Sequence, residues 1–165
     1  MKLSAILLSL VLIASSFTTL KKWYSYKNEE TKISVKFPAE YEETTSEQEK
    51  SVTYKAQFQN NQMMFLASSS VHESSLENDV EGLLETSVDS FGESLNATLV
   101  SVESIKLKRV NGSFATFSYG NQNGKLEYRV FLKDNIQYQI ITAQLGGEYD
   151  QRNADKFYKS FKIMK

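Results

Sequence analysis

Alternation of apolar and polar side chains is the feature that most limits what this chain can fold into. From Ser51 to Gln59 every second residue is apolar, and the stretch from Leu126 to Lys133 follows nearly the same pattern. Successive side chains on a strand point to opposite faces, so a period of two indicates half-buried strands. Turn residues such as Asn111-Gly112 separate these segments and predict antiparallel neighbours joined by short hairpins.

Two segments replace this alternation with apolar residues spaced three and four apart. Between Leu76 and Leu95 this spacing predicts a helix over about residues 75–92, with Ser74 and Glu77 forming a capping box at its start. The closing segment Asp155–Ile163 is also amphipathic and predicts a second helix over about residues 149–161. Each helix needs an apolar surface to cover, so we expect an antiparallel sheet with both helices packed on it.

Two irregular segments give further local expectations. Residues 40–50 are polar and acidic, which predicts a surface loop. Val100 and Val102 share one phase, whereas Ile105 and Leu107 share the other. One extra residue in a strand shifts the phase in this way, so the sequence predicts a β-bulge near Ser104.

The first residues have the pattern of a secretory signal peptide. Lys2 precedes an apolar run, and the small residues Ala14 and Ser16 stand before a cleavage point at Phe17. The apolar run falls short of the roughly 20 residues that span a bilayer. We therefore expect a signal peptide over residues 1–16, a short leader over 17–22, and an exported protein that is periplasmic or extracellular. An uncleaved membrane anchor is the alternative. No stable membrane insertion is expected after cleavage.

Composition narrows the class of protein further. The sequence contains no cysteine, so neither disulfides nor a lipid-modified cysteine are available, and the core alone must stabilise the fold. A net charge of −1 provides no electrostatic basis for binding nucleic acid. The remaining length fits a single domain over residues 23–165.

Two terminal motifs carry a family resemblance. An extended segment ending in Phe37-Pro38 follows the signal peptide, and the chain closes with the helix Asp155-Lys156-Phe157-Tyr158-Lys159-Ser160-Phe161-Lys162. Together with the order of strands and helices, these motifs resemble the PsbP-like superfamily, named after an extrinsic subunit of photosystem II. The resemblance implies an α/β (α+β) fold, namely an α/β/α sandwich around a central antiparallel sheet of about six to eight strands. It also implies a role in binding another protein, but it transfers no residue-level function.

A row of acidic residues is the first candidate for a partner surface. Glu77, Glu81, Glu85 and Asp89 recur every four residues on the predicted mid-chain helix, where like charges repel one another. A solvated helix face is the simplest interpretation, and a basic protein partner is the alternative. Trp23, at the start of the ordered chain, is either an edge anchor or a further partner contact.

Two other hypotheses concern small molecules. Tyr119, Tyr128 and Tyr138 lie on predicted strands and suggest an aromatic-lined pocket for an apolar ligand, although strand aromatics usually belong to the core. His72 is the only histidine, so a hydrolase using imidazole would depend on it. Its serine neighbours alternate along a strand and cannot form a triad locally. The sequence carries no cofactor or metal motif, and none is predicted.

The sequence as a whole favours an exported, non-catalytic protein that binds a protein partner at or outside the cell envelope. A carrier of small apolar ligands is the alternative, and a hydrolase using His72 is the third hypothesis.

Overall fold

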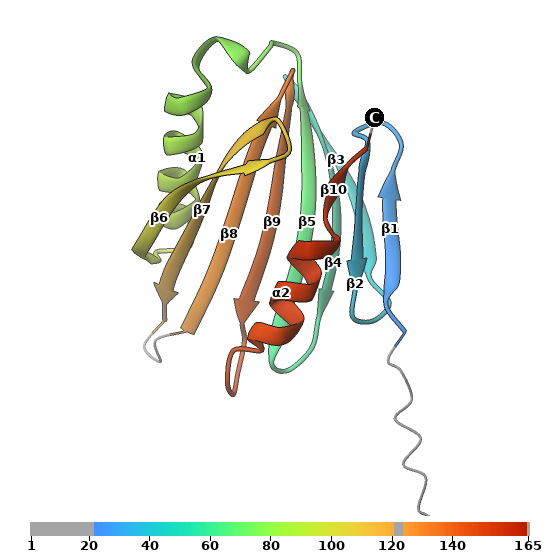
Figure 1. The fold of residues 1–165 in the computed structure, drawn as a ribbon, viewed down its shortest axis with the longest axis vertical. Coiled ribbons are helices and arrows are strands. Elements are labelled where there is room, and N and C mark those ends of the chain that lie inside the picture. Colours follow the sequence, from blue (N-terminus) through green and yellow to red (C-terminus); the bar gives the residue numbers. More distant parts are fainter. Residues whose placement is uncertain (1–21, 121–123, 165) are drawn as a thin grey trace, which may run out of the picture.

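The computed structural model describes residues 22–120 and 124–164, in which it places ten strands and two α-helices (Figure 1). The strands are β1 (Tyr24–Asn28), β2 (Ile33–Phe37), β3 (Glu42–Gln48), β4 (Ser51–Gln59), β5 (Met63–His72), β6 (Thr98–Leu107), β7 (Val110–Tyr119), β8 (Gly124–Lys133), β9 (Ile136–Gln144) and β10 (Lys162–Ile163). The helices are α1 (Val80–Ser94), preceded by a 3₁₀ turn at Glu77–Asp79, and α2 (Gln151–Ser160). The predicted signal peptide lies outside the described residues, as does the predicted leader except for Lys22.

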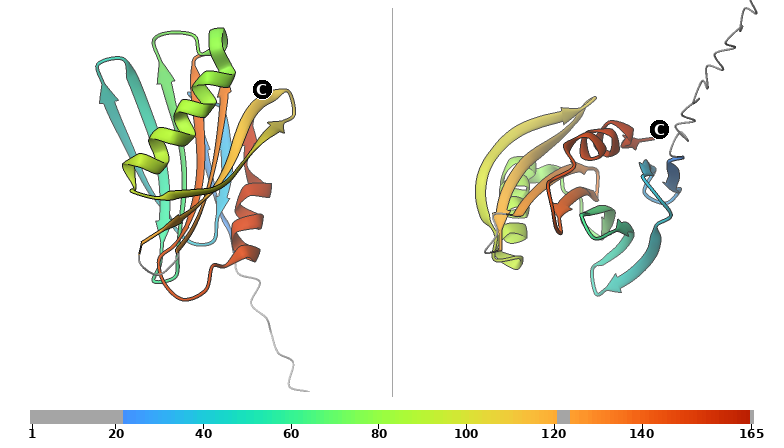
Figure 2. Two further views of the ribbon diagram at one scale, coloured as in Figure 1. Left: turned by 90° about the vertical axis from the view of Figure 1, so that its left-hand side faces the viewer. Right: turned by 90° about the horizontal axis from the view of Figure 1, so that it is seen from below.

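Seven antiparallel strands form the central sheet, in the order β3-β4-β5-β9-β8-β7-β6. A second, smaller antiparallel sheet has the order β1-β2-β10. The central sheet is strongly curved where β6 and β7 bend away from the other strands (Figure 2). The predicted antiparallel sheet of about six to eight strands is therefore confirmed, and the remaining strands form a separate layer.

The two helices lie on opposite faces of the central sheet, and each covers its own apolar core (Figures 1 and 2). Leu84 and Val88 of α1 pack on one face with Tyr128 of β8. Phe157 of α2 packs on the other face with Phe131 of β8 and with residues of the small sheet. Because successive side chains of a strand point to opposite faces, the same strands contribute apolar residues to both cores. The predicted sandwich and both predicted helices are therefore confirmed.

Both helices begin at aspartate caps. The Asp79 carboxylate accepts a hydrogen bond from the Gly82 N–H at 3.1 Å, so α1 starts at Val80, later than the predicted residue 75. The predicted capping residues 74–77 lie before and within the 3₁₀ turn, where Ser75 Oγ accepts from the Glu77 N–H. The Asp150 carboxylate caps α2 in the same way, by accepting from the Asn153 N–H at 3.0 Å.

The acidic segment predicted as a surface loop contains strand β3, so that prediction was wrong. Residues 42–48 pair in regular register with β4, although every one of them is exposed. Because β3 lies at the edge of the sheet and buries no side chain, it has no apolar alternation to reveal it. Its stability comes from backbone hydrogen bonds to β4.

The bulge in β6 lies earlier than predicted. The register with β7 shifts between Leu99 and Ser101, whereas the sequence suggested Ser104. Val102 is exposed, whereas Ile105 and Leu107 pack against the core beneath α2. The apolar phase changes along β6 because the strand carries apolar residues on both of its faces. Ile105 and Leu107 are covered by the core on one face, whereas Val102 on the other face stays exposed.

Candidate protein-binding groove between α1 and β6

A groove of about 870 Å³ runs between α1 and β6 on one face of the central sheet. It forms because α1 packs mainly on β7 and β8 and leaves the edge strand β6 less covered. Leu84 and Val88 of α1 line its inner wall, and Leu99 and Val102 of β6 line its outer wall. We call this hollow the α1–β6 groove.

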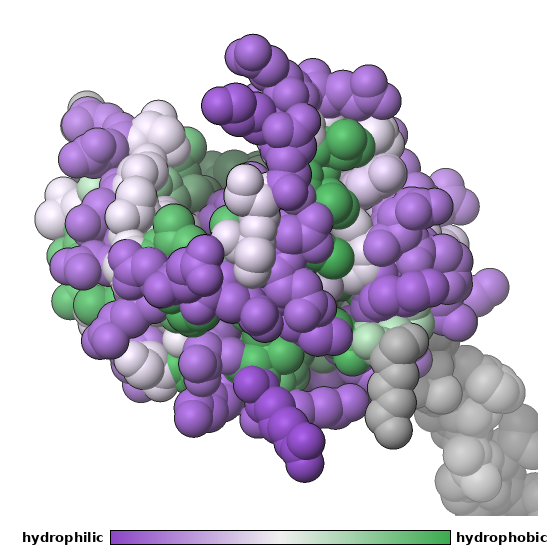
Figure 3. Space-filling model, turned by 90° about the horizontal axis from the view of Figure 1, so that it is seen from above, coloured by the Kyte–Doolittle hydropathy of each residue, from purple (hydrophilic) through white to green (hydrophobic). Residues whose placement is uncertain are grey.

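Exposed apolar residues gather in one short segment of the chain, which includes two residues of the groove wall. Of the five large hydrophobic residues exposed in the described chain, four lie between residues 95 and 102, and we call them the apolar strip: Leu95, Leu99, Val100 and Val102. Val100 is 64% exposed and Val102 is 54% exposed. The upper end of the molecule, by contrast, is largely hydrophilic, with hydrophobic side chains in patches between polar ones (Figure 3). Concentration of exposed apolar area in one place is typical of an interaction surface.

Three of the four acidic residues singled out in the sequence line the same groove. Glu81, Glu85 and Asp89 of α1 form an acidic row along one wall, and Lys106 of β6 lies among the groove residues as well. None of the three carboxylates forms an ion pair with a cation in the part of the chain that the structure describes. The groove therefore combines apolar walls with negative charge.

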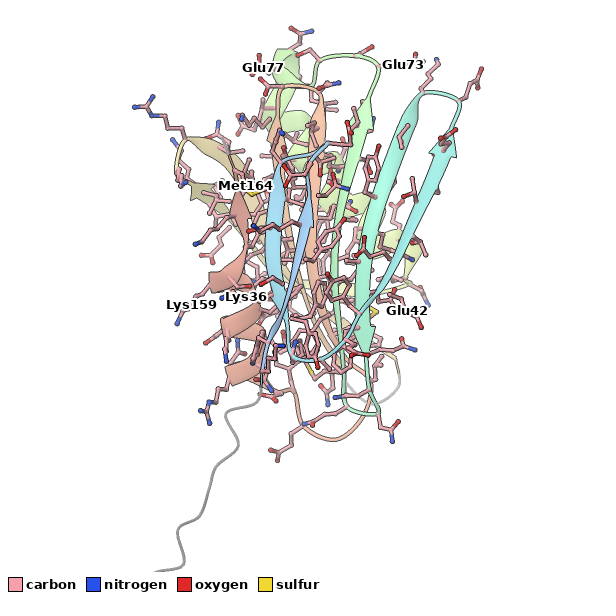
Figure 4. All side chains as sticks on the ribbon, turned by 90° about the vertical axis from the view of Figure 1, so that its right-hand side faces the viewer. Lys36, Glu42, Glu73, Glu77, Lys159 and Met164 are labelled. Atoms are coloured by element: carbon pink, nitrogen blue, oxygen red, sulfur yellow. The ribbon has the colours of Figure 1, made fainter. Side chains whose placement is uncertain are left out.

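Glu77 and Trp23 lie away from the groove. Glu77 is in the 3₁₀ turn before α1, at the upper end of the molecule, where Glu73 also lies (Figure 4). Trp23 packs against the core beneath α2, with Lys156 Nζ 4.3 Å from the centroid of its ring. The five residues suggested by the sequence therefore do not form one surface, because α1 and α2 lie on opposite faces of the sheet.

The three tyrosines proposed as a pocket lining belong to different places. Tyr128 is buried beneath α1, where Phe91 stacks on its ring with centroids 4.1 Å apart. Tyr138 is buried on the opposite face, and its hydroxyl donates to the Thr31 carbonyl at 3.0 Å. Tyr119 packs at the margin of the core beneath α1. Because adjacent strands place these rings on both faces, they cannot line one pocket.

His72 ends β5 and takes part in a turn contact. Its backbone N–H donates to the Asn135 carbonyl at 2.8 Å, and the Asn135 side-chain amide donates to the His72 carbonyl at 2.6 Å. The ring atom Nε2 is buried and has no hydrogen-bond partner among the described residues. Within residues 22–120 and 124–164, neither a serine nor a carboxylate forms a hydrogen bond to this imidazole, as a hydrolase would require.

A cluster of charged and hydroxyl side chains that the sequence did not suggest lies beneath α2. Glu127 of β8 is almost fully buried, with Lys125 Nζ 2.7 Å and Arg129 Nη1 3.5 Å from its carboxylate. The Arg129 guanidinium lies between two rings, 3.4 Å from the centroid of Tyr158 and 3.9 Å from that of Phe114. Lys125, Glu127 and Arg129 alternate with apolar residues along β8. From the sequence alone, this pattern indicates the solvent-exposed face of a strand. Their contacts join α2 to the sheet.

Buried tyrosine hydroxyls will make the protein lose stability as the pH rises above about 10. Burial raises the pKa of Tyr149 and of Tyr158 well above the ordinary value, and burial with nearby Asp134 raises the pKa of Tyr138 to about 12. The unfolded chain then releases these protons at lower pH than the folded chain. The contribution of these protonated hydroxyls to the free energy of unfolding is complete below pH 10, and it declines as the pH approaches their pKa values in the folded protein. Urea midpoints measured from pH 8 to pH 11.5 should fall, and Tyr149→Phe should make that fall shallower.

Two kinds of site are absent from the described chain. No group of three or more histidine, aspartate or glutamate side chains within residues 22–120 and 124–164 is arranged to hold a metal ion. No helix in these residues has the length and apolar character needed to cross a membrane.

Comparison with known proteins supports the fold and no closer relationship. No protein-family model and no curated protein sequence matches this chain. The structure is similar to the solution structure of cyanobacterial PsbP (CyanoP) from Synechocystis sp. PCC 6803, with a TM-score of 0.60 and 9% sequence identity. The match covers 92% of this chain and 98% of that one. The chain therefore has a PsbP-like fold, which confirms the resemblance read from the two terminal motifs.

Proposed function

We propose that this chain is an exported, single-domain, non-catalytic protein of PsbP-like fold that binds a protein partner in the α1–β6 groove. The observation that carries this proposal is the apolar strip beside the acidic row. Exposing Leu99 and Val102 of the groove wall to water is unfavourable, and a partner that covers them would gain the free energy of removing apolar area from water. The three unpaired carboxylates would orient that partner through its charge.

The alternatives receive less support from the molecule. A carrier would need an enclosed apolar cavity, whereas Phe91 fills the space over Tyr128. A hydrolase would need an imidazole aligned between a nucleophile and an acid, whereas His72 is held by turn contacts of its backbone. Binding of a partner in the α1–β6 groove would instead cover the exposed apolar residues of β6 and pair the carboxylates of α1.

Export is proposed from residues 1–16 alone. If the signal peptide is removed, intact-mass measurement of the protein recovered from the cell envelope or medium should give a chain beginning at Phe17. Recovery of the uncleaved chain from the cytosol would contradict export.

Partner binding is tested by affinity capture from the native envelope fraction with two matched variants. Val102→Asp places a charge in the groove, and Leu145→Asp places the same charge on a similarly exposed apolar residue in the loop after β9. We expect the proteins captured by the natural sequence to be lost with Val102→Asp and retained with Leu145→Asp. Circular dichroism establishes that both variants fold. Equal capture by both variants, or capture of nothing above background by the natural protein, would contradict binding at this groove.

A further inference from the structure

We propose that the partner binds as an added strand on the free edge of β6, and that it carries lysine or arginine at alternate positions facing the acidic row. This proposal rests on the groove being the binding surface. It specifies the partner's backbone conformation and its charge, neither of which the groove alone determines.

The two edges of the central sheet differ in a way that identifies the pairing edge. β3 carries three glutamates and no apolar residue, and charged edge strands resist pairing with other chains. The opposite edge, β6, carries Leu99, Val100, Val102, Ile105 and Leu107 with a single glutamate and a single lysine. An edge of ten residues with high β-propensity and little charge is suited to accept another strand.

The geometry of β6 defines how much of this edge is usable. From Ser101 to Leu107 the strand pairs with β7 without interruption, and the bulge after Leu99 ends this regular stretch. Within the described chain, no strand pairs with the other side of β6. An added strand would therefore pair over about seven residues, and it would extend the sheet by one strand spacing, about 4.8 Å.

Charge complementarity selects a cationic strand. Every second side chain of the added strand would point to the face of the sheet that α1 covers, toward the groove wall that holds Glu81, Glu85 and Asp89. Lysine and arginine have long apolar stems, which can lie on Val102 and Leu99 while their charged ends reach the carboxylates. Ion pairing there would relieve the repulsion between acids spaced four residues apart on α1.

The same charges oppose pairing with a second copy of this chain. Antiparallel pairing of two β6 strands about a two-fold axis places both α1 helices on the same face, on either side of the seam. Six carboxylates, three from each acidic row, would then line that seam. Like charges brought together at an interface cost affinity, so a cationic partner fits better than a second copy.

Peptide probes test the conformation and the charge separately. The first probe is a capped nine-residue peptide alternating lysine and valine. The second is the same peptide with alternate backbone nitrogens methylated, which removes donors while keeping every side chain, and the third has glutamate in place of lysine. Fluorescence anisotropy at low salt should detect binding of the first probe to the natural protein. Binding of the second and third should be at least about tenfold weaker, because several hydrogen bonds or ion pairs are lost.

Matched protein variants locate the site. Glu81→Gln, Glu85→Gln and Asp89→Asn together neutralise the acidic row, while Glu42→Gln, Glu43→Gln and Glu47→Gln together make the same change in net charge on β3. The first set should weaken the lysine probe at least about tenfold, and the second set should leave its affinity within about twofold. An equal loss with both sets would show an effect of net charge alone and would overturn the proposed site.

The remaining outcomes also decide the proposal. Equal affinity of the methylated peptide would overturn strand addition, and equal affinity of the glutamate peptide would overturn the cationic partner. Failure of the lysine probe to bind at millimolar concentration, or self-association that sedimentation detects and Val102→Asp abolishes, would overturn both. None of these results would alter the capture experiment with Val102→Asp and Leu145→Asp, so failure of strand addition is distinguishable from failure of partner binding.

Discussion

Replacing Glu127 by alanine will lower the free energy of unfolding by about 3 kcal/mol, because it leaves the largely buried guanidinium of Arg129 without its carboxylate partner. Glu127 is 3% exposed and lies between Lys125 and Arg129. Lys125 is partly exposed and can turn toward water. Arg129 is held between the rings of Phe114 and Tyr158, so its guanidinium must stay where it is. Urea denaturation followed by circular dichroism measures the change.

Two further variants separate charge from packing. Glu103→Ala removes an exposed acid on β6 opposite Phe114 and should change stability by no more than about 0.5 kcal/mol. Replacing Glu127 and Arg129 together by methionine removes both charges, and we expect it to recover most of the loss. A loss for Glu127→Ala as small as that for Glu103→Ala would mean that water reaches the guanidinium and that the cluster does not hold α2 to the sheet.

Burial explains which elements the sequence could predict. β4 and β8 alternate because each has at least one apolar face, and α2 places Ala154 and Phe157 at helical spacing for the same reason. β3 has no buried residue and therefore no periodic signal. The strand forms because it pairs with β4, and this pairing leaves no periodic pattern in the sequence of β3 itself.

Local turn signals proved less reliable than periodicity. Asn111-Gly112 predicted a hairpin turn, but the turn between β6 and β7 is formed by Lys108 and Arg109, with Lys108 at a φ of 58°. Gly112 lies inside β7, where a Cβ atom would be 2.5 Å from the Val130 carbonyl oxygen. Glycine is required at residue 112 because β7 and β8 approach closely there. The Asn-Gly dipeptide alone does not distinguish such a close approach of strands from a hairpin turn.

The candidate groove could be predicted only in part. The acidic row follows from a spacing of four on α1, and Glu81, Glu85 and Asp89 do line the groove. The exposure of Val102 could not be predicted, because strand sequences do not show how far a helix extends over its sheet. The exposed wall of the groove arises because α1 packs mainly on β7 and β8 and leaves Leu99 and Val102 of β6 exposed.

Phe157→Ala will lower the free energy of unfolding by about 3–5 kcal/mol, because it opens a cavity where α2 meets the core. The side chain is fully buried, with its ring centroid 5.0 Å from that of Phe37 on β2 and 5.4 Å from that of Phe65 on β5. Phe157 therefore joins the closing helix to the small sheet and to the central sheet. The loss should appear in urea and in thermal denaturation alike.

Matched variants distinguish the cavity from a loss of helix propensity. Lys159→Ala alters an exposed residue of the same helix and should be nearly neutral, whereas Phe157→Leu keeps much of the volume and should cost less than Phe157→Ala. The groove belongs to the other core, around Leu84 and Val88, so Phe157→Ala should bind the lysine probe normally while it remains folded. An unchanged unfolding midpoint would mean that α2 contributes nothing to the core. Loss of probe binding by the folded variant would mean that the two faces of the sheet are coupled.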